Sequence, residues 1–233
     1  MNLLVNGCSF SRGPTAWPYH IKGANIVNLA CAGAGNDYIF NTTIAELSQR
    51  QYDFVAIMWT HPARIDVKVN DIDQFSDTPY TSLHQSARND WAEKIVYPVN
   101  DQDYVEKDWV FGCGFLNHDP ALLKTKLFDR NYFYQDNIQF ARMTLIKMIA
   151  LQNTLKQMNI PYLFTYFRDY ETNLAKISNL YNLLDQSHIY NKQNIYTITK
   201  NNNWYDNDGL HPGIQAHQQW AKIITPLINA RQS

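Results

Sequence analysis

The sequence lacks a surplus of either charge, and this excludes partners that are recognised by bulk electrostatics. Lysine and arginine together number 20 and aspartate and glutamate 21, so the formal net charge is −1. A nucleic-acid-binding surface, or a contact with an anionic membrane, requires a clustered positive excess. We therefore expect no nucleic-acid partner and no membrane surface, and we expect recognition to depend on a few local groups.

Cysteines and long apolar runs are also scarce. The three cysteines, Cys8, Cys31 and Cys113, are too few for a disulfide framework, and no CxxC, HxH or HxxxH spacing suggests a metal site. The N-terminal residues do not form a basic segment followed by an apolar one, and no run of about 18 apolar residues occurs. These absences favour a soluble, cytoplasmic protein that uses no metal and no other cofactor.

The composition that is present is globular. The chain has 233 residues, of which 45% are hydrophobic and 18% charged, and this length favours one α/β domain with an insertion. Aromatic residues make up 14%. Because tyrosine and tryptophan suit half-exposed surfaces, they could line a ligand groove or simply pack in the core and its rim.

Short apolar runs alternate with segments of helical spacing. The apolar runs predict five strands, at residues 3–6, 25–29, 54–59, 161–167 and 194–198. The segments between them predict helices at residues 38–50, 135–158, 174–184 and 214–228. Since runs that are apolar on both faces suit parallel strands covered by helices, we predict a three-layer α/β/α fold with a doubly wound sheet.

The stretch 66–131 breaks this alternation. It has no strong period and is rich in aspartate, asparagine and aromatic residues. A structureless loop of this length is unusual, so we expect an insertion with small helices or a hairpin, inside a single domain that spans residues 1–233. Because ligands bind at the carboxyl ends of the strands in open α/β sheets, an insertion after the third strand could cap the site.

Three segments place small, polar or nucleophilic residues directly after predicted strands. They are residues 6–11 (Asn-Gly-Cys-Ser-Phe-Ser), residues 28–37, which contain two glycines, and residues 206–212, which contain Asp-x-x-His. In this order they resemble the signature blocks of the SGNH, or GDSL, hydrolase superfamily. The resemblance covers the chain outside the insertion, and it implies a flavodoxin-like five-stranded parallel sheet of order 2-1-3-4-5 and ester hydrolysis through an acyl-serine.

The first block carries the expected nucleophile. Ser9 occupies the place of the family's catalytic serine, and Gly7 that of the glycine two residues before it. Cys8 stands where the family usually has aspartate, a departure also seen in related Gly-x-Ser-Phe branches.

The later blocks match by spacing. Gly33 lies five residues after Asn28, as the family's oxyanion glycine follows its second-block asparagine. Asp208 and His211 match Asp-x-x-His, and the resemblance assigns them to a triad with Ser9.

Physical chemistry supports the same assignment. A serine hydroxyl is a weak nucleophile, so Ser9 needs a base within hydrogen-bond reach and an orienting group behind that base. His211 can take the proton, and Asp208 can fix the imidazole tautomer and stabilise the imidazolium. The N–H groups of Ser9 and Gly33 can face a substrate oxyanion.

The third block departs from the family, which has Gly-x-Asn-Asp after the third strand and uses that asparagine as an oxyanion donor. Here the strand is followed by Thr-His-Pro-Ala-Arg. Thr60, His61 or Arg64 could donate instead, and Asn36 of the second block could also fill the gap.

Two arginines remain open in role. The Arg64 guanidinium could pair with a carboxylate or phosphate of the substrate, or it could form a salt bridge with a neighbouring acid. Arg168 and the adjacent Asp169 end the fourth predicted strand, and they could belong to the rim or to a specificity pocket.

The leading hypothesis is a serine hydrolase that removes a small acyl group, such as acetyl, from a carbohydrate or another small molecule. An acyltransferase on the same triad, or a weakly catalytic module that binds a glycan or a protein, is the alternative. A nucleotide binder is disfavoured because the chain has no Walker lysine motif and no GxGxxG fingerprint. The oligomeric state is left open by the sequence.

Overall fold

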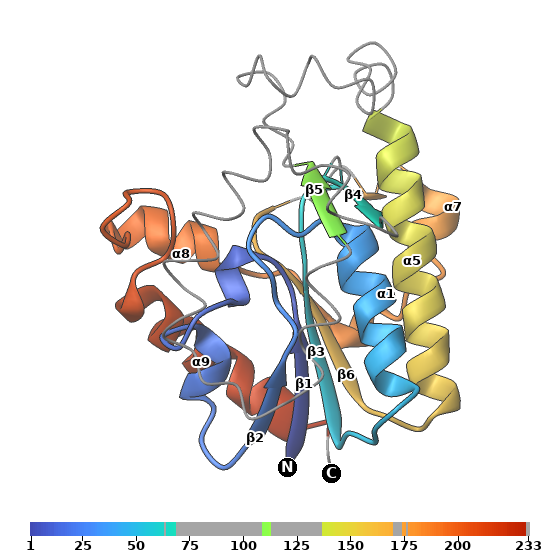
Figure 1. Cartoon of the computed structure of the whole chain (residues 1–233), viewed down its shortest axis with the longest axis horizontal. Coiled ribbons are helices and arrows are strands. Elements are labelled where there is room, and N and C mark those ends of the chain that lie inside the picture. The colour runs from blue at the N-terminus through green and yellow to red at the C-terminus, as the bar shows by residue number, and fades with distance from the viewer. Residues whose placement is uncertain (63, 69–108, 113–136, 170–173, 176, 232–233) are drawn as a thin grey trace.

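The computed structural model describes residues 1–62, 64–68, 109–112, 137–169, 174–175 and 177–231. Its main sheet has five parallel strands in the order β2-β1-β3-β6-β7 (Figure 1). When these strands are numbered along the chain, the order is the predicted 2-1-3-4-5, so the α/β fold class is confirmed. The strands are β1 (Asn2–Asn6), β2 (Asn25–Asn28), β3 (Phe54–Trp59), β6 (Tyr162–Tyr166) and β7 (Ile189–Tyr190).

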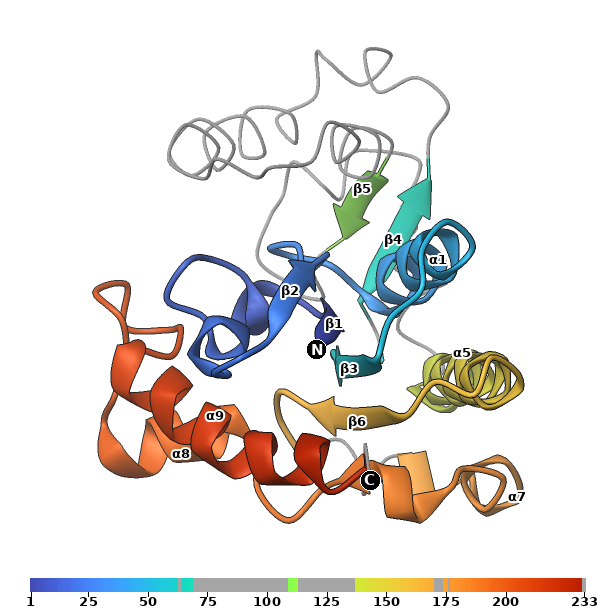
Figure 2. The same ribbon diagram turned by 90° about the horizontal axis from the view of Figure 1, so that it is seen from below.

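Helices cover both faces of this sheet, which gives the three layers (Figures 1 and 2). On one face lie α1 (Asn36–Leu47) and α5 (Asn137–Gln157), and on the other α8 (Ile195–Asn202) and α9 (Ile214–Asn229). Every residue of β3 is buried. Alternate residues of β3 enter the two separate apolar cores, and burial on both faces therefore explains its continuous apolar sequence.

The fifth strand is not at residues 194–198, so that prediction was wrong. These residues begin α8, and the strand is the two-residue β7, which pairs with β6. The Asn194 side chain accepts a hydrogen bond from the Thr197 N–H at 2.8 Å and so caps the helix. Ile195 and Ile198, both buried, share one helix face; their β-branched side chains are also typical of strands, and this similarity misled the prediction.

The other helices agree with their predicted positions to different degrees. α5 and α9 end within two residues of the predicted bounds, and α1 begins two residues before and ends three residues before its predicted limits. In the predicted helix 174–184, by contrast, α7 covers only Ser178–Tyr181. No helix in the described part of the chain has the length and apolarity that crossing a membrane requires.

Most of the predicted insertion 66–131 lies outside the described residues. Two described segments, β4 (Ile65–Lys68) and β5 (Trp109–Gly112), pair antiparallel and form a second, two-stranded sheet (Figure 2). The residues between these two strands lie outside the described part of the chain, so the expected small helices or hairpin within the insertion stay a prediction. The assignment of 66–131 as a cap within one domain stays a prediction.

Asp66 of β4 caps the amino end of α1. Its Oδ1 accepts a hydrogen bond from the Gly35 N–H and its Oδ2 one from the Tyr38 N–H, each at 2.8 Å. The carboxylate thereby satisfies two N–H groups that the start of a helix leaves without a partner. A Cβ atom on residue 35 would lie 2.7 Å from Asp66 Oδ2, so glycine permits this close approach.

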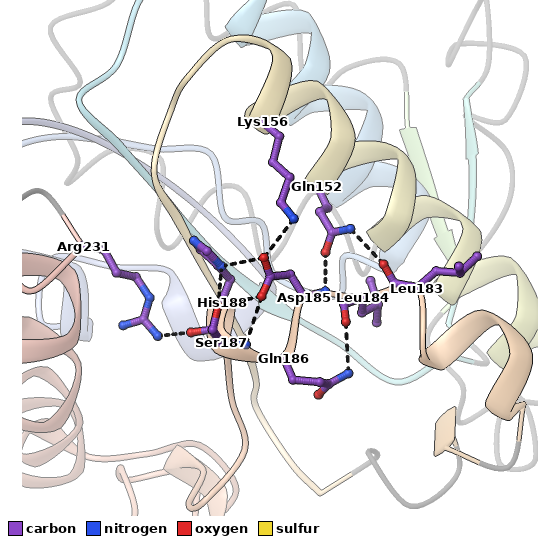
Figure 3. Close-up of polar contacts among 9 residues, drawn as sticks. All are labelled: Gln152, Lys156, Leu183, Leu184, Asp185, Gln186, Ser187, His188 and Arg231. Atoms are coloured by element: carbon purple, nitrogen blue, oxygen red, sulfur yellow. Dashed lines mark hydrogen bonds and ion pairs between the residues drawn. The ribbon is translucent and has the colours of Figure 1, made fainter.

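The turn before β7 is tied to helices on both faces of the sheet (Figure 3). From α5, Lys156 donates to Asp185 at 2.8 Å, and Gln152 accepts a hydrogen bond from the Asp185 N–H at 2.7 Å. From the end of α9, Arg231 donates to the Ser187 carbonyl. These contacts position a strand that is too short to be held by its ladder bonds alone.

Asn194→Ala is expected to lower the free energy of unfolding by about 1 kcal/mol, because it removes the N-cap of α8. Urea denaturation followed by circular dichroism measures the change. Asn201→Ala, at an exposed position of the same helix, is the control. An equal loss in both variants would contradict a capping role for Asn194.

Burial raises the pKa of Asp66 from 3.8 to about 6, although the Tyr38 and Gly35 N–H groups oppose the shift. A raised carboxyl pKa stabilises the folded state fully below pH 3.8, and this contribution is lost as the pH rises through 6. The free energy of unfolding of the wild type, relative to Asp66→Asn, should therefore fall by about 3 kcal/mol between pH 3.5 and pH 7. Urea titrations at each pH test this, and a constant difference would refute it.

Candidate active site

Ser9 lies in a tight turn directly after β1. It is the first residue of a 3-10 helix, η1 (Ser9–Ser11), which begins after Cys8 in an extended conformation. The turn is closely packed, since a Cβ atom on Gly7 would lie 2.8 Å from Ser11 Oγ and 3.2 Å from the Met58 carbonyl oxygen. Glycine at position 7 therefore lets the turn pack against the end of β3.

Two buried asparagines brace this turn. Asn6 Oδ1 accepts a hydrogen bond from the Gly7 N–H, and its amide donates to the Ile39 carbonyl on α1. Asn28, at the end of β2, donates to the Ser11 carbonyl at 2.7 Å and accepts from the Ala30 N–H at 3.0 Å. Asn28 therefore satisfies backbone groups at the end of its strand and links the first block to the second.

His211 and Asp208 lie in a closed loop just before α9. The Asp206 N–H donates to the His211 carbonyl at 2.8 Å, and the Gly213 N–H donates to the Trp204 carbonyl at 2.7 Å. A Cβ atom on Gly213 would lie 2.9 Å from the Tyr205 carbonyl oxygen, so glycine allows the two sides of the loop to meet. The loop is thus held closed by backbone hydrogen bonds on both sides of His211.

In the structure, His211 is hydrogen-bonded to Ser9 on one side of its ring and to Asp208 on the other. His211 Nε2 lies 3.0 Å from Ser9 Oγ, and His211 Nδ1 lies 2.5 Å from Asp208 Oδ2. The tautomer with its proton on Nδ1 satisfies both contacts, because the ring then donates to the carboxylate and accepts from the hydroxyl. This geometry can move the hydroxyl proton to the imidazole and leave a nucleophilic oxygen.

Asp208 also builds the turn that presents His211. Its Oδ1 accepts hydrogen bonds from the Leu210 N–H at 2.8 Å and from the His211 N–H at 2.9 Å. Burial alone would raise the pKa of Asp208, but these backbone donors and the His211 side chain together lower it to about 2. The carboxylate is therefore anionic at any pH near neutrality.

Aromatic packing supports the imidazole from the side. Phe10, the residue after Ser9, lies 5.5 Å from the His211 ring and 4.6 Å from the Phe167 ring, centroid to centroid. Phe10 is buried. Phe10 therefore links the Ser9 turn to the His211 loop and to the segment that follows β6.

The N–H groups of Ser9 and Gly33 are the predicted backbone donors to the oxyanion. As the first residue of η1, Ser9 has no partner for its N–H within that helix, and no other described residue accepts it. Gly33 has a φ of +81°, a conformation that favours glycine. The neighbouring Cys31 N–H donates to the Gly7 carbonyl at 3.2 Å, so the two turns lie side by side.

Asn36 and Thr60 are both buried, where the start of α1 meets the end of β3. Asn36 donates its amide hydrogens to the Thr60 carbonyl and to Thr144 Oγ1, and it accepts from the Thr60 N–H at 3.0 Å. The Thr60 hydroxyl is buried without a hydrogen-bond partner. Neither side chain is therefore presented as an oxyanion donor, and Asn36 instead joins the start of α1 to the end of β3.

His61 and Arg64 lie in the turn between β3 and β4. The Arg64 N–H donates to the His61 carbonyl at 3.0 Å, and Arg64 Nη1 donates to the Ala34 carbonyl at 3.1 Å. Burial lowers the pKa of His61, and the charges of Arg64 and Arg168 lower it further. An imidazole with a lowered pKa is mainly neutral at pH 7 and offers one N–H donor.

A second grouping of serine, histidine and aspartate lies in the turn before β7, at the amino end of that strand (Figure 3). Ser187 Oγ is 3.0 Å from His188 Nδ1 and 2.6 Å from Asp185 Oδ1. Here the hydroxyl contacts the carboxylate directly, and Lys156 occupies the other carboxylate oxygen. The order of contacts needed to activate a serine through histidine is therefore absent from this grouping.

Among the residues that the structure describes, no three histidine, cysteine, aspartate or glutamate side chains are grouped so that they could hold a metal ion.

Phe10 and Asp66 are the supporting residues that the sequence did not reveal. In the sequence, Phe10 cannot be distinguished from other core aromatic residues. Asp66 lies 28 positions from Tyr38, whose N–H it accepts at the start of α1, so its capping role is not visible as a local pattern.

No family model and no curated protein matches this chain. Similar solved structures include the psychrotrophic esterase EstA from Pseudoalteromonas sp., at 12% identity and a TM-score of 0.47, covering 99% of this chain and 95% of that chain. The acetyl xylan esterase AlAXEase is 10% identical, with a TM-score of 0.47 and coverage of 98% and 100%. A variant of the acetyl xylan esterase Axe2 from Geobacillus stearothermophilus is 14% identical, with a TM-score of 0.48 and coverage of 97% and 94%. At such identities and TM-scores, these likenesses assign no function and no residue roles to this chain.

Proposed function

We propose that this protein is a serine hydrolase of the SGNH type that cleaves a small acyl ester. The observation that carries the proposal is the series from Ser9 Oγ to His211 Nε2 at 3.0 Å and from His211 Nδ1 to Asp208 at 2.5 Å. Its members come from opposite ends of the chain, and each is held by hydrogen bonds of its own turn. A nucleophile, a base and an orienting carboxylate in this order are what acyl transfer to serine requires.

In the first half of the proposed reaction, Ser9 Oγ attacks the ester carbonyl carbon as His211 Nε2 takes the hydroxyl proton. A tetrahedral oxyanion forms, and the anionic Asp208 stabilises the imidazolium across the Nδ1 hydrogen bond. The carbon–oxygen bond to the alcohol then breaks, and His211 returns the proton to the leaving oxygen. The products of this half are the free alcohol and an acyl-Ser9.

In the second half, a water molecule attacks the acyl carbon and gives its proton to His211. The bond from the acyl carbon to Ser9 Oγ then breaks, and the proton returns to Ser9. The acid is released and the triad is restored. The side chains of His211 and Asp208 are 41% and 45% exposed, so water has access to the base, and this favours hydrolysis over transfer to another alcohol.

The N–H groups of Ser9 and Gly33 are the proposed donors to the oxyanion. Backbone donors need no rearrangement during the reaction and act most strongly where water is displaced by substrate. The asparagine side chain that serves as a further donor in the SGNH family has no counterpart at the end of β3. Asn36 does not replace it, because Asn36 donates both of its amide hydrogens to groups inside the fold. We propose an acetyl ester of a carbohydrate or of a similar polar small molecule as substrate.

Ser9→Ala is expected to abolish both turnover of p-nitrophenyl acetate and covalent labelling by a fluorophosphonate, because the attacking oxygen is removed. Mass spectrometry of the labelled wild type should place the modification on Ser9. Ser187→Ala is the matched control, since Ser187 also contacts a histidine and an aspartate. Labelling that survives in Ser9→Ala would refute the proposal.

Asp208→Asn is expected to lower kcat by roughly 10⁴. The asparagine oxygen would stay on the two backbone N–H groups, so its NH2 group would face His211 Nδ1. Because an NH2 group cannot accept a hydrogen bond from Nδ1–H, the wrong imidazole tautomer is favoured. The side-chain oxygen can still accept from the Leu210 and His211 N–H groups, so the fold should be kept. Steady-state kinetics and urea denaturation separate the two effects. A loss of activity that merely followed a loss of stability would contradict the orienting role of Asp208.

A further inference from the structure

Two arginines lie in the segments that follow neighbouring strands, at the carboxyl edge of the sheet, where the candidate active site also lies. Arg64 follows β3 and Arg168 follows β6, and these two strands are neighbours. The Arg64 guanidinium lies 5.4 Å from the Phe167 ring centroid, and Phe167 packs against Phe10 at 4.6 Å. Arg64 is thus two ring contacts away from the residue that follows Ser9.

Each guanidinium is oriented by one hydrogen bond and one aromatic ring. Arg64 donates to the Ala34 carbonyl, next to Gly33, and lies over Phe167. Arg168 donates to the Tyr196 hydroxyl at 3.1 Å and lies 4.2 Å from the centroid of that ring. A guanidinium has five N–H donors, so each arginine is positioned while most of its donors stay available to a ligand.

These two positive charges have no ion-pair partner in the described part of the chain. Asp66 is the carboxylate whose pKa responds to Arg64, and both of its oxygens accept N–H groups of α1. His61 is near enough to both guanidiniums for their charges to affect its own protonation. Two guanidiniums without an ion-pair partner thus act on the same histidine, His61, in a protein whose net charge is −1.

We propose that Arg64 and Arg168 bind an anionic group of the ester substrate, a carboxylate, a phosphate or a sulfate. The inference rests on the proposed function and narrows the small acyl ester proposed there to one that carries an anionic group, on its acyl or its alcohol side. Planar guanidinium groups match the geometry of these oxyanions and bind them through charge-assisted hydrogen bonds. Of the two roles that the sequence left open for Arg64, the salt bridge with a neighbouring acid is not formed among the described residues.

Two matched pairs of esters test the proposal and locate the anionic group. Monophenyl succinate and phenyl pentanoate differ by a charge on the acyl side, and 4-acetoxybenzoate and 4-acetoxybenzamide differ by a charge on the alcohol side. In at least one pair, kcat/KM of the wild type should be about tenfold higher for the anionic ester, as expected for a charge-assisted contact. A ratio within about twofold of one in both pairs would overturn the proposal.

Arg64→Met and Arg168→Met should each lower that ratio by about fivefold or more, because methionine retains the apolar stem and removes the charge. Arg50→Met is the control, since Arg50 lies between α1 and the amino end of β3, away from the carboxyl edge of the sheet, and pairs with Glu46. Its ratio should equal that of the wild type. A ratio that is unchanged in both Arg64→Met and Arg168→Met would overturn the proposal.

A binding measurement separates this inference from the proposed hydrolysis. The Ser9→Ala protein is titrated with monophenyl succinate and with 4-acetoxybenzoate by calorimetry, with and without Arg64→Met. Binding of either ester that weakens about tenfold in the double variant supports the anion site even if the wild type hydrolyses neither ester. Turnover of neutral esters without any binding of the anionic ones would keep the hydrolase and reject the anion site.

Discussion

The hydrogen bond between His211 Nε2 and Ser9 Oγ joins residues that are 202 positions apart, and much of the fold serves to make it. In a parallel sheet the carboxyl ends of all strands lie at one edge, so the turn after β1 and the loops after β2, β3 and β6 meet there. The loop before α9 reaches the same edge because α9 packs against β6, on the sheet face where residues of β1, β3 and β6 share one core with it. Residues that are far apart in the sequence thereby come into contact at this edge.

Buried asparagines maintain this edge. Asn6, Asn28 and Asn36 stand at the ends of β1 and β2 and at the start of α1, and each joins its own segment to a neighbouring one. An asparagine amide can donate and accept at once, so one side chain satisfies backbone groups on two sides. Replacing such a residue by an apolar one would leave buried backbone groups without partners.

The two groupings of serine, histidine and aspartate show why residue types alone do not define an active site. In both, the serine hydroxyl lies 3.0 Å from an imidazole nitrogen. Asp208 contacts the far nitrogen of His211, whereas Asp185 contacts the Ser187 hydroxyl itself and is paired with Lys156. Only the first order of contacts can pass a proton from serine to histidine and stabilise the resulting charge. The second forms the turn that precedes β7.

The sequence by itself determined four of the five strands, the principal helices and the three segments that meet in the candidate site, because periodicity and strand-end turns are local properties. It failed at β7, since two residues of an edge strand carry too little pattern to outweigh the β-branched start of α8. Only the tertiary structure decided that Asn36 is engaged within the fold, that Asp66 caps α1, and that Arg64 lies over Phe167. These roles depend on contacts between distant segments, which pattern along the chain does not encode.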